Sequence, residues 1–257
     1  MSDVFENRDM AGTTFRRLNL GGATFDDVNL GETTFHNVNL SGAVIREANL
    51  GGLRIEGCAI RGLIVHGMDI YPLIEAELDR RDPQRASLRM RDPFDPSSVR
   101  EVMARLEDLR ARFRQTLYSV EPARLTARPK PEKWSAIENV RHLVFAEDMY
   151  LNRWLLRNDR PWTKLGLLPS FLADNPAFAE VSRQPSGNLE EILAAWDEIH
   201  AGMRAFLADL TADVLRRDTS DVDFGQRTVG GILQGMALHD LHHIQLAEEA
   251  LQKLAVT

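Results

Sequence analysis

Large apolar residues recur at every fifth position through the first seventy residues of the chain. The series runs without interruption through Met10, Phe15, Leu20, Phe25, Leu30, Phe35, Leu40, Ile45, Leu50, Ile55, Ile60, Val65 and Ile70. A period of five matches neither an α-helix, with roughly 3.6 residues per turn, nor a strand, which alternates with a period of about two. It matches a solenoid in which each five-residue side points two residues inward and glycines form the corners.

The repeated segments ANLGG at 48–52 and VNLSG at 38–42 resemble the consensus A-(D/N)-L-x-x of the pentapeptide-repeat family. The resemblance covers about residues 5–70. It implies a right-handed quadrilateral β-helix whose successive coils lie about 4.8 Å apart. We therefore expect a buried interior that includes these side chains: Phe15, Phe25, Phe35, Leu40 and Cys58.

Helical spacing replaces the fivefold pattern after residue 70. YPLIEAELDRR at 71–81 predicts an amphipathic helix that would cover the last coil, and the Pro-, Asp- and Arg-rich stretch 82–98 predicts an irregular linker. Apolar residues at spacings of three and four then predict four long helices, at about 98–119, 135–157, 189–210 and 228–254.

These patterns together predict a two-domain chain. The expected parts are a pentapeptide-repeat β-helix at 1–70, a capping helix and linker at 71–97, and an all-α four-helix bundle at 98–257. The connection 158–188 inside the bundle is too long for a simple turn, and loops of that length often act as lids.

The last predicted helix carries three histidines in the stretch HDLHH. His239 and His243 lie on the apolar stripe that also holds Ile232 and Met236, whereas His242 is rotated from that stripe by about 100°. Inward imidazoles have polar atoms that need a partner. A divalent metal ion satisfies such an i, i+4 pair, so the spacing indicates a metal site.

A third ligand would have to come from another helix. His142 in the second helix is one candidate, and His200 in the third helix is the competing one. The alternative interpretation of His142 is a buried or capping histidine that binds no metal. Glu138 lies one turn before His142 and could ligate, but Ser135 and Glu138 form a capping-box pattern that already accounts for its position.

Composition narrows the class of protein. The chain has 257 residues, of which 44% are hydrophobic and 27% charged, and these fractions are typical of a globular protein. Its net charge of −7 argues against a nucleic-acid surface. The single cysteine excludes an internal disulfide and fits a reducing compartment. The sequence shows no signal peptide and no apolar run near the ~20 residues that span a bilayer. We therefore expect a cytoplasmic protein with neither nucleic acid nor membrane as a partner.

Two motifs resemble the DinB-like superfamily of metal-binding four-helix bundles. They are WSAIENVRHLVFAED in the second predicted helix and HDLHHIQ in the last, and the resemblance spans about 100–255. It implies that His142, His239 and His243 bind Zn²⁺ or Ni²⁺. The fusion of this bundle to pentapeptide repeats also resembles a group of proteins common in actinobacteria.

The resemblance further implies an activity. Characterised DinB-like proteins include transferases and isomerases that use low-molecular-weight thiols such as mycothiol or bacillithiol. By this resemblance we expect a metal-dependent thiol S-transferase or isomerase that acts on an electrophilic small molecule. Phe145, Trp162 and Met236 would shape the pocket, and Trp162 with Leu165–Leu168 would form a lid, although core packing explains these lid residues equally well.

Two other functions fit parts of the sequence. A non-enzymatic metal-binding or interaction module would use the repeats as a scaffold or as a homodimer contact. HDLHH also matches the H-x-x-x-H pattern of metalloproteases. That match is weak, because Asp240 is one methylene shorter than the general-base Glu of those enzymes and only fourteen residues follow His243.

Overall fold

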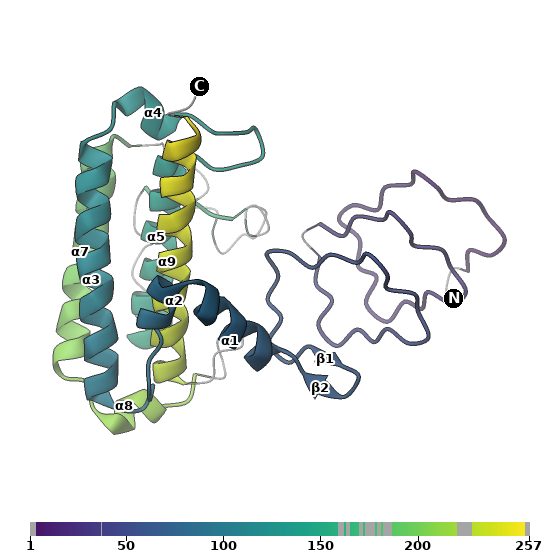
Figure 1. Ribbon diagram of the computed structural model, residues 1–257, viewed down its shortest axis with the longest axis horizontal. Coiled ribbons are helices and arrows are strands. Elements are labelled where there is room, and N and C mark those ends of the chain that lie inside the picture. Colours follow the sequence, from purple (N-terminus) through teal and green to yellow (C-terminus); the bar gives the residue numbers. More distant parts are fainter. Residues whose placement is uncertain are drawn as a thin grey trace. The chain divides into compact units, whose positions relative to one another are not determined.

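The computed structural model describes residues 4–36, 38–158, 162, 165–169, 172, 178, 181, 187–219 and 228–254 (Figure 1). Contacts divide the chain into two units, Met1–Leu50 and Gly51–Thr257. The helices all belong to the second unit, which also holds the candidate site. No helix in the described part of the chain is long and apolar enough to cross a membrane.

The repeat segment changes direction at every fifth residue, and two kinds of corner alternate along it. At one kind, the Ala23 N–H donates to the Leu20 carbonyl at 2.9 Å, and Gly22 takes a φ of 79°. The Asn19 side chain accepts a backbone N–H at 3.0 Å and so starts this turn. At the other kind, a residue such as Arg17, with a φ of 53°, bends the chain. The structural repeat is therefore ten residues long, which explains why Asp or Asn precedes only every second apolar anchor.

The β-helix expected for this segment is not seen as strands. Residues 4–36 and 38–63 contain only turns, bends and irregular backbone. The side chains predicted to be interior are exposed: Phe15 by 57%, Phe25 by 58%, Phe35 by 53% and Leu40 by 57%, with Cys58 as an exposed free thiol. The prediction of a buried interior is wrong for this structure. Fivefold spacing specifies the corners, which are local, whereas a closed interior also needs hydrogen bonds between strands of successive coils.

Two short strands lie at the end of the fivefold series. β1 (Ile64–Val65) and β2 (Met68–Asp69) form an antiparallel hairpin. Its two turn residues, His66 and Gly67, have φ values of 48° and 78°. Positive φ at both central positions is the geometry that matches the twist of a two-residue hairpin.

Helices make up most of the remaining described chain. In order they are α1 (Tyr71–Arg81), α2 (Pro83–Ser87), α3 (Pro96–Tyr118), α4 (Pro122–Thr126), α5 (Ala136–Asp148), the π-helix η1 (Met149–Leu155), α7 (Leu189–Ala208), α8 (Ala212–Arg216) and α9 (Val229–Lys253). The four long helices predicted from apolar spacing are confirmed as α3, α5 continued by η1, α7 and α9. The linker expected to be irregular contains α2, because Asp82 accepts the N–H groups of Gln84 and Arg85 and so caps a short helix.

Capping side chains fix where the bundle helices begin. The predicted capping box of α5 is confirmed: the Glu138 N–H donates to the Ser135 hydroxyl at 3.3 Å, and the Ser135 N–H donates to the Glu138 carboxylate at 2.9 Å. Asn188 and Glu191 form a second box at the start of α7. Thr228 caps α9. These side chains satisfy N–H groups that have no partner within the helix.

The long helices pack side by side as a bundle (Figure 1). α5 contacts both α9 and α7, and α9 also contacts α3. Large side chains from all four helices fill the core and are at most 1% exposed: Leu106, Phe113, Leu143, Trp196 and Ile244. Because α5 and α9 lie against each other, polar residues on their facing sides are brought together inside the bundle.

Candidate metal centre

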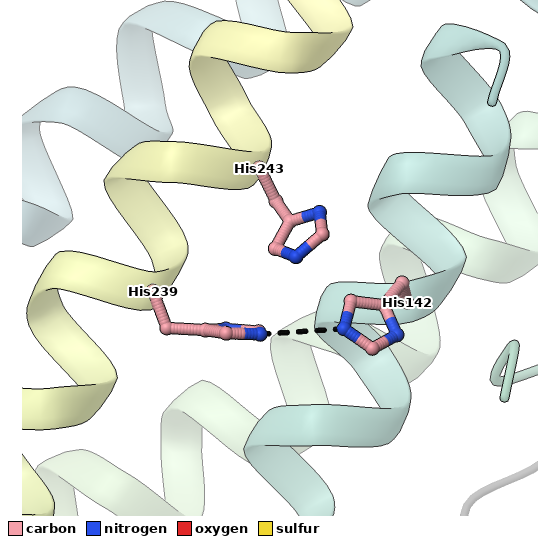
Figure 2. A group of neighbouring side chains, drawn as sticks. All are labelled: His142, His239 and His243. Carbon is pink, nitrogen blue, oxygen red and sulfur yellow. Dashed lines mark hydrogen bonds between the residues drawn. The ribbon is translucent and has the colours of Figure 1, made fainter. Parts of the chain in front are cut away.

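The facing sides of α5 and α9 bring three histidines together (Figure 2). His142 comes from α5, and His239 and His243 lie one turn apart on α9. One ring nitrogen of each histidine lies within 4.8 Å of those of the other two. His142 is 7% exposed, and the other two rings are half-buried. This group could hold a metal ion.

The spacing of the rings matches the size of a tetrahedral metal site. His142 Nε2 lies 3.3 Å from His239 Nε2. Zinc–nitrogen bonds are about 2.0–2.1 Å long, so two nitrogen ligands of a tetrahedral ion lie about 3.3 Å apart. The ring centroid of His243 lies 4.4 Å from that of His142 and 4.6 Å from that of His239. The residues present therefore fit a divalent cation with three imidazole ligands.

In His142 and His243 the Nδ1 atom makes a hydrogen bond outside the cluster, which leaves the Nε2 atom free. His142 Nδ1 lies 3.1 Å from the Leu167 carbonyl, and His243 Nδ1 lies 3.0 Å from Asn139 Oδ1. Both acceptors require a proton on Nδ1, so each Nε2 keeps its lone pair. The Asn139 amide donates to the Ser135 carbonyl at 2.9 Å, which turns its oxygen toward His243. Metal-binding histidines have this kind of support on their second nitrogen.

The third ring has a carboxylate as its neighbour. His239 Nδ1 lies 3.7 Å from Asp240 Oδ1, and among the described residues both atoms are buried without a hydrogen-bond partner. Arg110 binds the other oxygen of Asp240. A proton on His239 Nδ1 would face this carboxylate and leave Nε2 as the metal-facing nitrogen.

A buried charge network lies beneath the histidines. Arg110 is 1% exposed and pairs with Glu147 at 2.8 Å as well as with Asp240, both of which are fully buried. Trp196 Nε1 donates to the Glu147 carboxylate at 2.6 Å. His200 Nε2 lies 3.0 Å from the same carboxylate. Burial raises the pKa of both carboxyl groups, against the opposing charge of Arg110.

Burial keeps two of the candidate ligands, His142 and His243, uncharged. It lowers the pKa of His142 to about 3, with a smaller contribution from His239, and it also lowers the pKa of His243. Neutral imidazole is the form that binds metal, because a protonated ring has no free lone pair. Near neutral pH these two rings are therefore ready to act as ligands.

The structure separates the other candidate ligands from this cluster. His200 is buried in the Arg110–Glu147 network and does not join the three histidines, so the competing candidate for the third ligand is not supported. Glu138 pairs with Arg128 and closes the capping box of α5. His242 is exposed, as its position off the apolar stripe predicts.

Aromatic rings surround the cluster. Of the expected pocket residues, the Phe145 ring lies 6.3 Å from that of His142 and 5.5 Å from that of Trp162. Met236 is fully buried in the bundle core. Two rings that the sequence did not single out also lie close. Trp134 is 5.0 Å from His142, and Tyr150, on the π-helix, is 5.9 Å from His239.

The residues that support the three rings leave little signal in the sequence. Asn139 lies three positions before His142, so helical spacing alone would have placed this polar side chain near the same buried face. The Leu167 carbonyl and Arg110 carry no comparable signal. Each comes from a segment far along the chain, and only the tertiary fold brings it to the histidines.

Two known families match parts of the chain. A profile of the DinB superfamily matches residues 105–247, which is more than half of the chain. The chain belongs to the DinB superfamily. Eight copies of the pentapeptide repeat match at residues 23–62, in front of the DinB region. No curated protein and no solved structure matches the chain. All three clustered histidines lie inside the DinB match.

Proposed function

We propose that this DinB-superfamily chain is a metal-dependent S-transferase or isomerase. In this proposal His142, His239 and His243 hold Zn²⁺ or Ni²⁺, and a low-molecular-weight thiol of the mycothiol or bacillithiol type is joined to an electrophilic small molecule. An ion held by three neutral imidazoles keeps a coordination position open and favours the deprotonated form of a thiol. The observation that carries the proposal is the convergence of one nitrogen from each of the three histidines.

The chain's own residues would orient the ligands and limit access of water. Asn139 and the Leu167 carbonyl hold two of the rings. Trp134, Phe145 and Tyr150 place aromatic surfaces next to the same histidines. Such surfaces favour an apolar or aromatic electrophile over a strongly charged one.

The thiol would come from a small molecule. The single cysteine, Cys58, lies in the pentapeptide repeats, and the metal-binding group of the described chain consists of histidines alone. A thiol that enters the site from solution would therefore supply the nucleophile.

The test incubates the full-length, metal-loaded protein with low-molecular-weight thiols and generic electrophiles and measures conjugate formation by mass spectrometry. We expect conjugation that requires both the thiol and the metal. His239→Ala should abolish it, and His242→Ala, at the exposed histidine, should leave it unchanged. If the loaded protein neither consumes the thiol nor converts the electrophile in a thiol-dependent way, or if both variants behave alike, the enzyme proposal fails.

A second candidate is a metal-binding interaction module without catalysis. The observation that favours it is the row of phenylalanines, Phe15, Phe25 and Phe35, each more than half exposed on the repeats. In this case the repeats would contact another molecule, a second copy of the chain included, while the bundle binds metal. Sedimentation of the full chain would give a dimer mass for the homodimer form, and the conjugation assay would then be negative.

A further inference from the structure

The segment Leu165–Leu167 is hydrogen-bonded to two consecutive residues of α5, Arg141 and the candidate ligand His142. Arg141 Nε donates to the Leu165 carbonyl at 2.8 Å, and its Nη2 donates to the Gly166 carbonyl at 3.1 Å. The Leu167 N–H donates to the Arg141 carbonyl at 2.9 Å. His142 Nδ1 then lies 3.1 Å from the Leu167 carbonyl. Four hydrogen bonds thus join this segment to two consecutive residues of α5.

Gly166 allows the segment to approach so closely. A Cβ atom at this position would lie 2.9 Å from Phe145 Cβ and 3.3 Å from Phe145 Cα. The second atom belongs to the backbone of α5 and cannot turn aside as the end of a flexible side chain can. Any residue larger than glycine would therefore move the segment away from the helix.

The carbonyl of Leu167 decides which nitrogen of His142 carries the proton. A carbonyl accepts but does not donate, so the proton lies on Nδ1 and the lone pair on Nε2. Nε2 is the atom that faces His239 at 3.3 Å. If the segment shifted, the ring would lose the bond that fixes both its tautomer and its rotation.

We infer that Arg141 and Gly166 are positioning residues for the candidate metal centre, because they hold the Leu167 carbonyl where it fixes His142. This inference rests on the proposed metal binding for its effect on affinity. It also changes the role of residues 165–168, which the sequence suggested as part of a lid. The described segment is fixed to α5 through backbone and side-chain hydrogen bonds, which suits a support for a ligand better than a moving cover.

Zinc affinity of the full-length protein tests the steric part. In a competition titration with a chromophoric chelator, Gly166→Ala should bind Zn²⁺ about 10- to 100-fold more weakly than the wild type, the usual effect of losing outer support. Gly202→Ala is the matched control. Its added Cβ would also meet a neighbour at 2.9 Å, but that neighbour is the flexible end of Leu151. Equal affinity of the folded Gly166→Ala protein and the wild type would overturn the inference.

Arg141→Lys tests the hydrogen-bonded part and decides the matter if Gly166→Ala does not fold. Lysine cannot serve both carbonyls in the planar geometry of a guanidinium, so Zn²⁺ affinity should again fall. Arg100→Lys is the control, because Arg100 likewise donates to backbone carbonyls, those of Leu207 and Leu210 at 3.1 and 2.9 Å. Equal loss in both lysine variants would mean that the effect is on the bundle as a whole and would overturn the inference.

The tautomer of His142 gives a readout that does not depend on metal. Long-range ¹H–¹⁵N spectra of the metal-free protein should show His142 protonated on Nδ1 in the wild type, and a mixture of tautomers in Gly166→Ala. A wild-type ring protonated on Nε2 would overturn the inference. If the wild type binds no Zn²⁺ yet shows the Nδ1–H form and its loss in the variant, the metal proposal fails while the positioning role stands.

Discussion

At the scale of single residues, the candidate site depends on which ring nitrogens have a hydrogen-bond partner and which buried charges are paired. The inward placement of the pair His239 and His243 could be predicted, because the two residues repeat at the helical period on an apolar stripe. The choice between His142 and His200 could not be made by spacing, since both lie on inward faces. In the fold, α7 directs His200 to Glu147, whereas α5 directs His142 to His239 on α9.

Arg110 should be a large contributor to stability. It is the cation between Glu147 and Asp240, and Arg110→Met would leave two buried carboxylates without it. We expect a loss of about 3–5 kcal/mol in the free energy of unfolding, measured by urea denaturation. Arg114→Met is the control, because its pair with Asp197 is partly exposed and should contribute less than about 1 kcal/mol. Similar losses in the two variants would contradict the burial of the network.

His200 should make stability depend on pH. Burial, with Arg110 second, lowers the pKa of its ring from 6.5 to about 3. Between these values the unfolded chain binds a proton that the folded chain does not, so acidification below pH 6.5 favours unfolding. This residue should contribute about 1.4 kcal/mol of lost stability per pH unit in that window. Urea denaturation at several pH values between 6.5 and 5 gives the change in the free energy of unfolding per pH unit. In His200→Gln this change should be smaller by the stated amount. An unchanged pH dependence would contradict the assignment.

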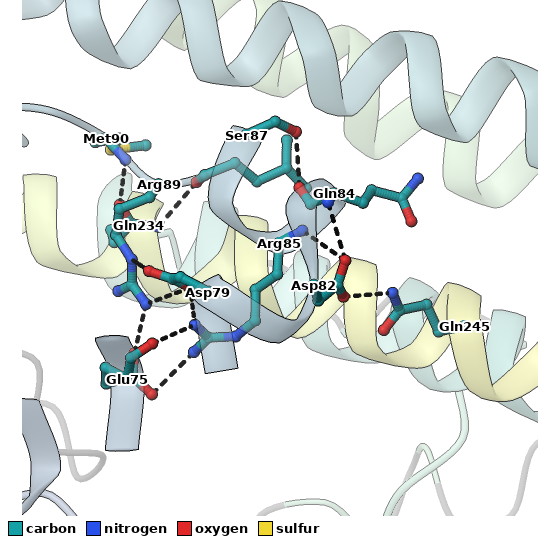
Figure 3. A network of polar contacts seen from close by, with 11 residues as sticks. Glu75, Asp79, Asp82, Gln84, Arg85, Ser87, Arg89, Met90, Gln234 and Gln245 are labelled. Atoms are coloured by element: carbon teal, nitrogen blue, oxygen red, sulfur yellow. Dashed lines mark hydrogen bonds and ion pairs between the residues drawn. The ribbon is translucent and has the colours of Figure 1, made fainter. Parts of the chain in front are cut away.

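At the scale of elements, α9 carries the histidine pair and also binds the segment 71–97. Figure 3 shows two of its side chains, Gln234 and Gln245, against that segment. Gln245 donates to Asp82 at 2.8 Å, and Gln234 binds the backbone of Leu88 and Met90. These contacts explain why polar residues occur among the apolar ones on this helix. The partners are far apart in the sequence. The apolar spacing therefore predicts α9 as a helix but does not reveal what its polar residues bind.

The polar side of α1 faces α2 (Figure 3). Glu75 and Asp79, one turn apart on α1, pair with Arg85 and Arg89; three of these contacts measure 2.8–2.9 Å. The apolar side chains of α1 are exposed, Leu73 by 62%. The amphipathic pattern of 71–81 correctly predicted a helix. Its role as a cap over the last coil stays a prediction.

The capping boxes should contribute measurably to the bundle. Ser135→Ala removes the hydroxyl that accepts the Glu138 N–H, and we expect a loss of about 1 kcal/mol in the free energy of unfolding. Ser119→Ala is the comparison, since its hydroxyl only bonds the Thr116 carbonyl at the end of α3. That change should cost less than about 0.5 kcal/mol. A result in the reverse order would show that the box does not fix the start of α5.

At the scale of the whole molecule, the repeats and the helical bundle are predicted by different sequence patterns. Helical spacing predicted the bundle well, because each amphipathic helix must bury its apolar side against another. The fivefold spacing predicted the corners of the repeats but not the exposure of their side chains. Corners depend on neighbouring residues such as Asn19 and Gly22, whereas burial depends on how successive coils associate.

Phe25→Asp in the full chain tests whether the side chains of the repeats are exposed. The Phe25 side chain is 58% exposed and belongs to the first unit. The change should therefore leave both the thermal unfolding of the bundle and its metal affinity within error of the wild type. A loss of several kcal/mol in a separate unfolding step of the repeats would indicate that Phe25 is buried, as the period-five pattern predicts for a closed solenoid.

An equilibrium titration of the full chain with Zn²⁺ measures whether the three histidines bind a metal ion. We predict one ion per chain at neutral pH, with weaker binding in acid as protons compete for the imidazole lone pairs. Alanine at His142, His239 or His243 should each remove most of the binding, while alanine at His242 or His200 should not. Absence of binding, or an equal loss at His242, would contradict the account.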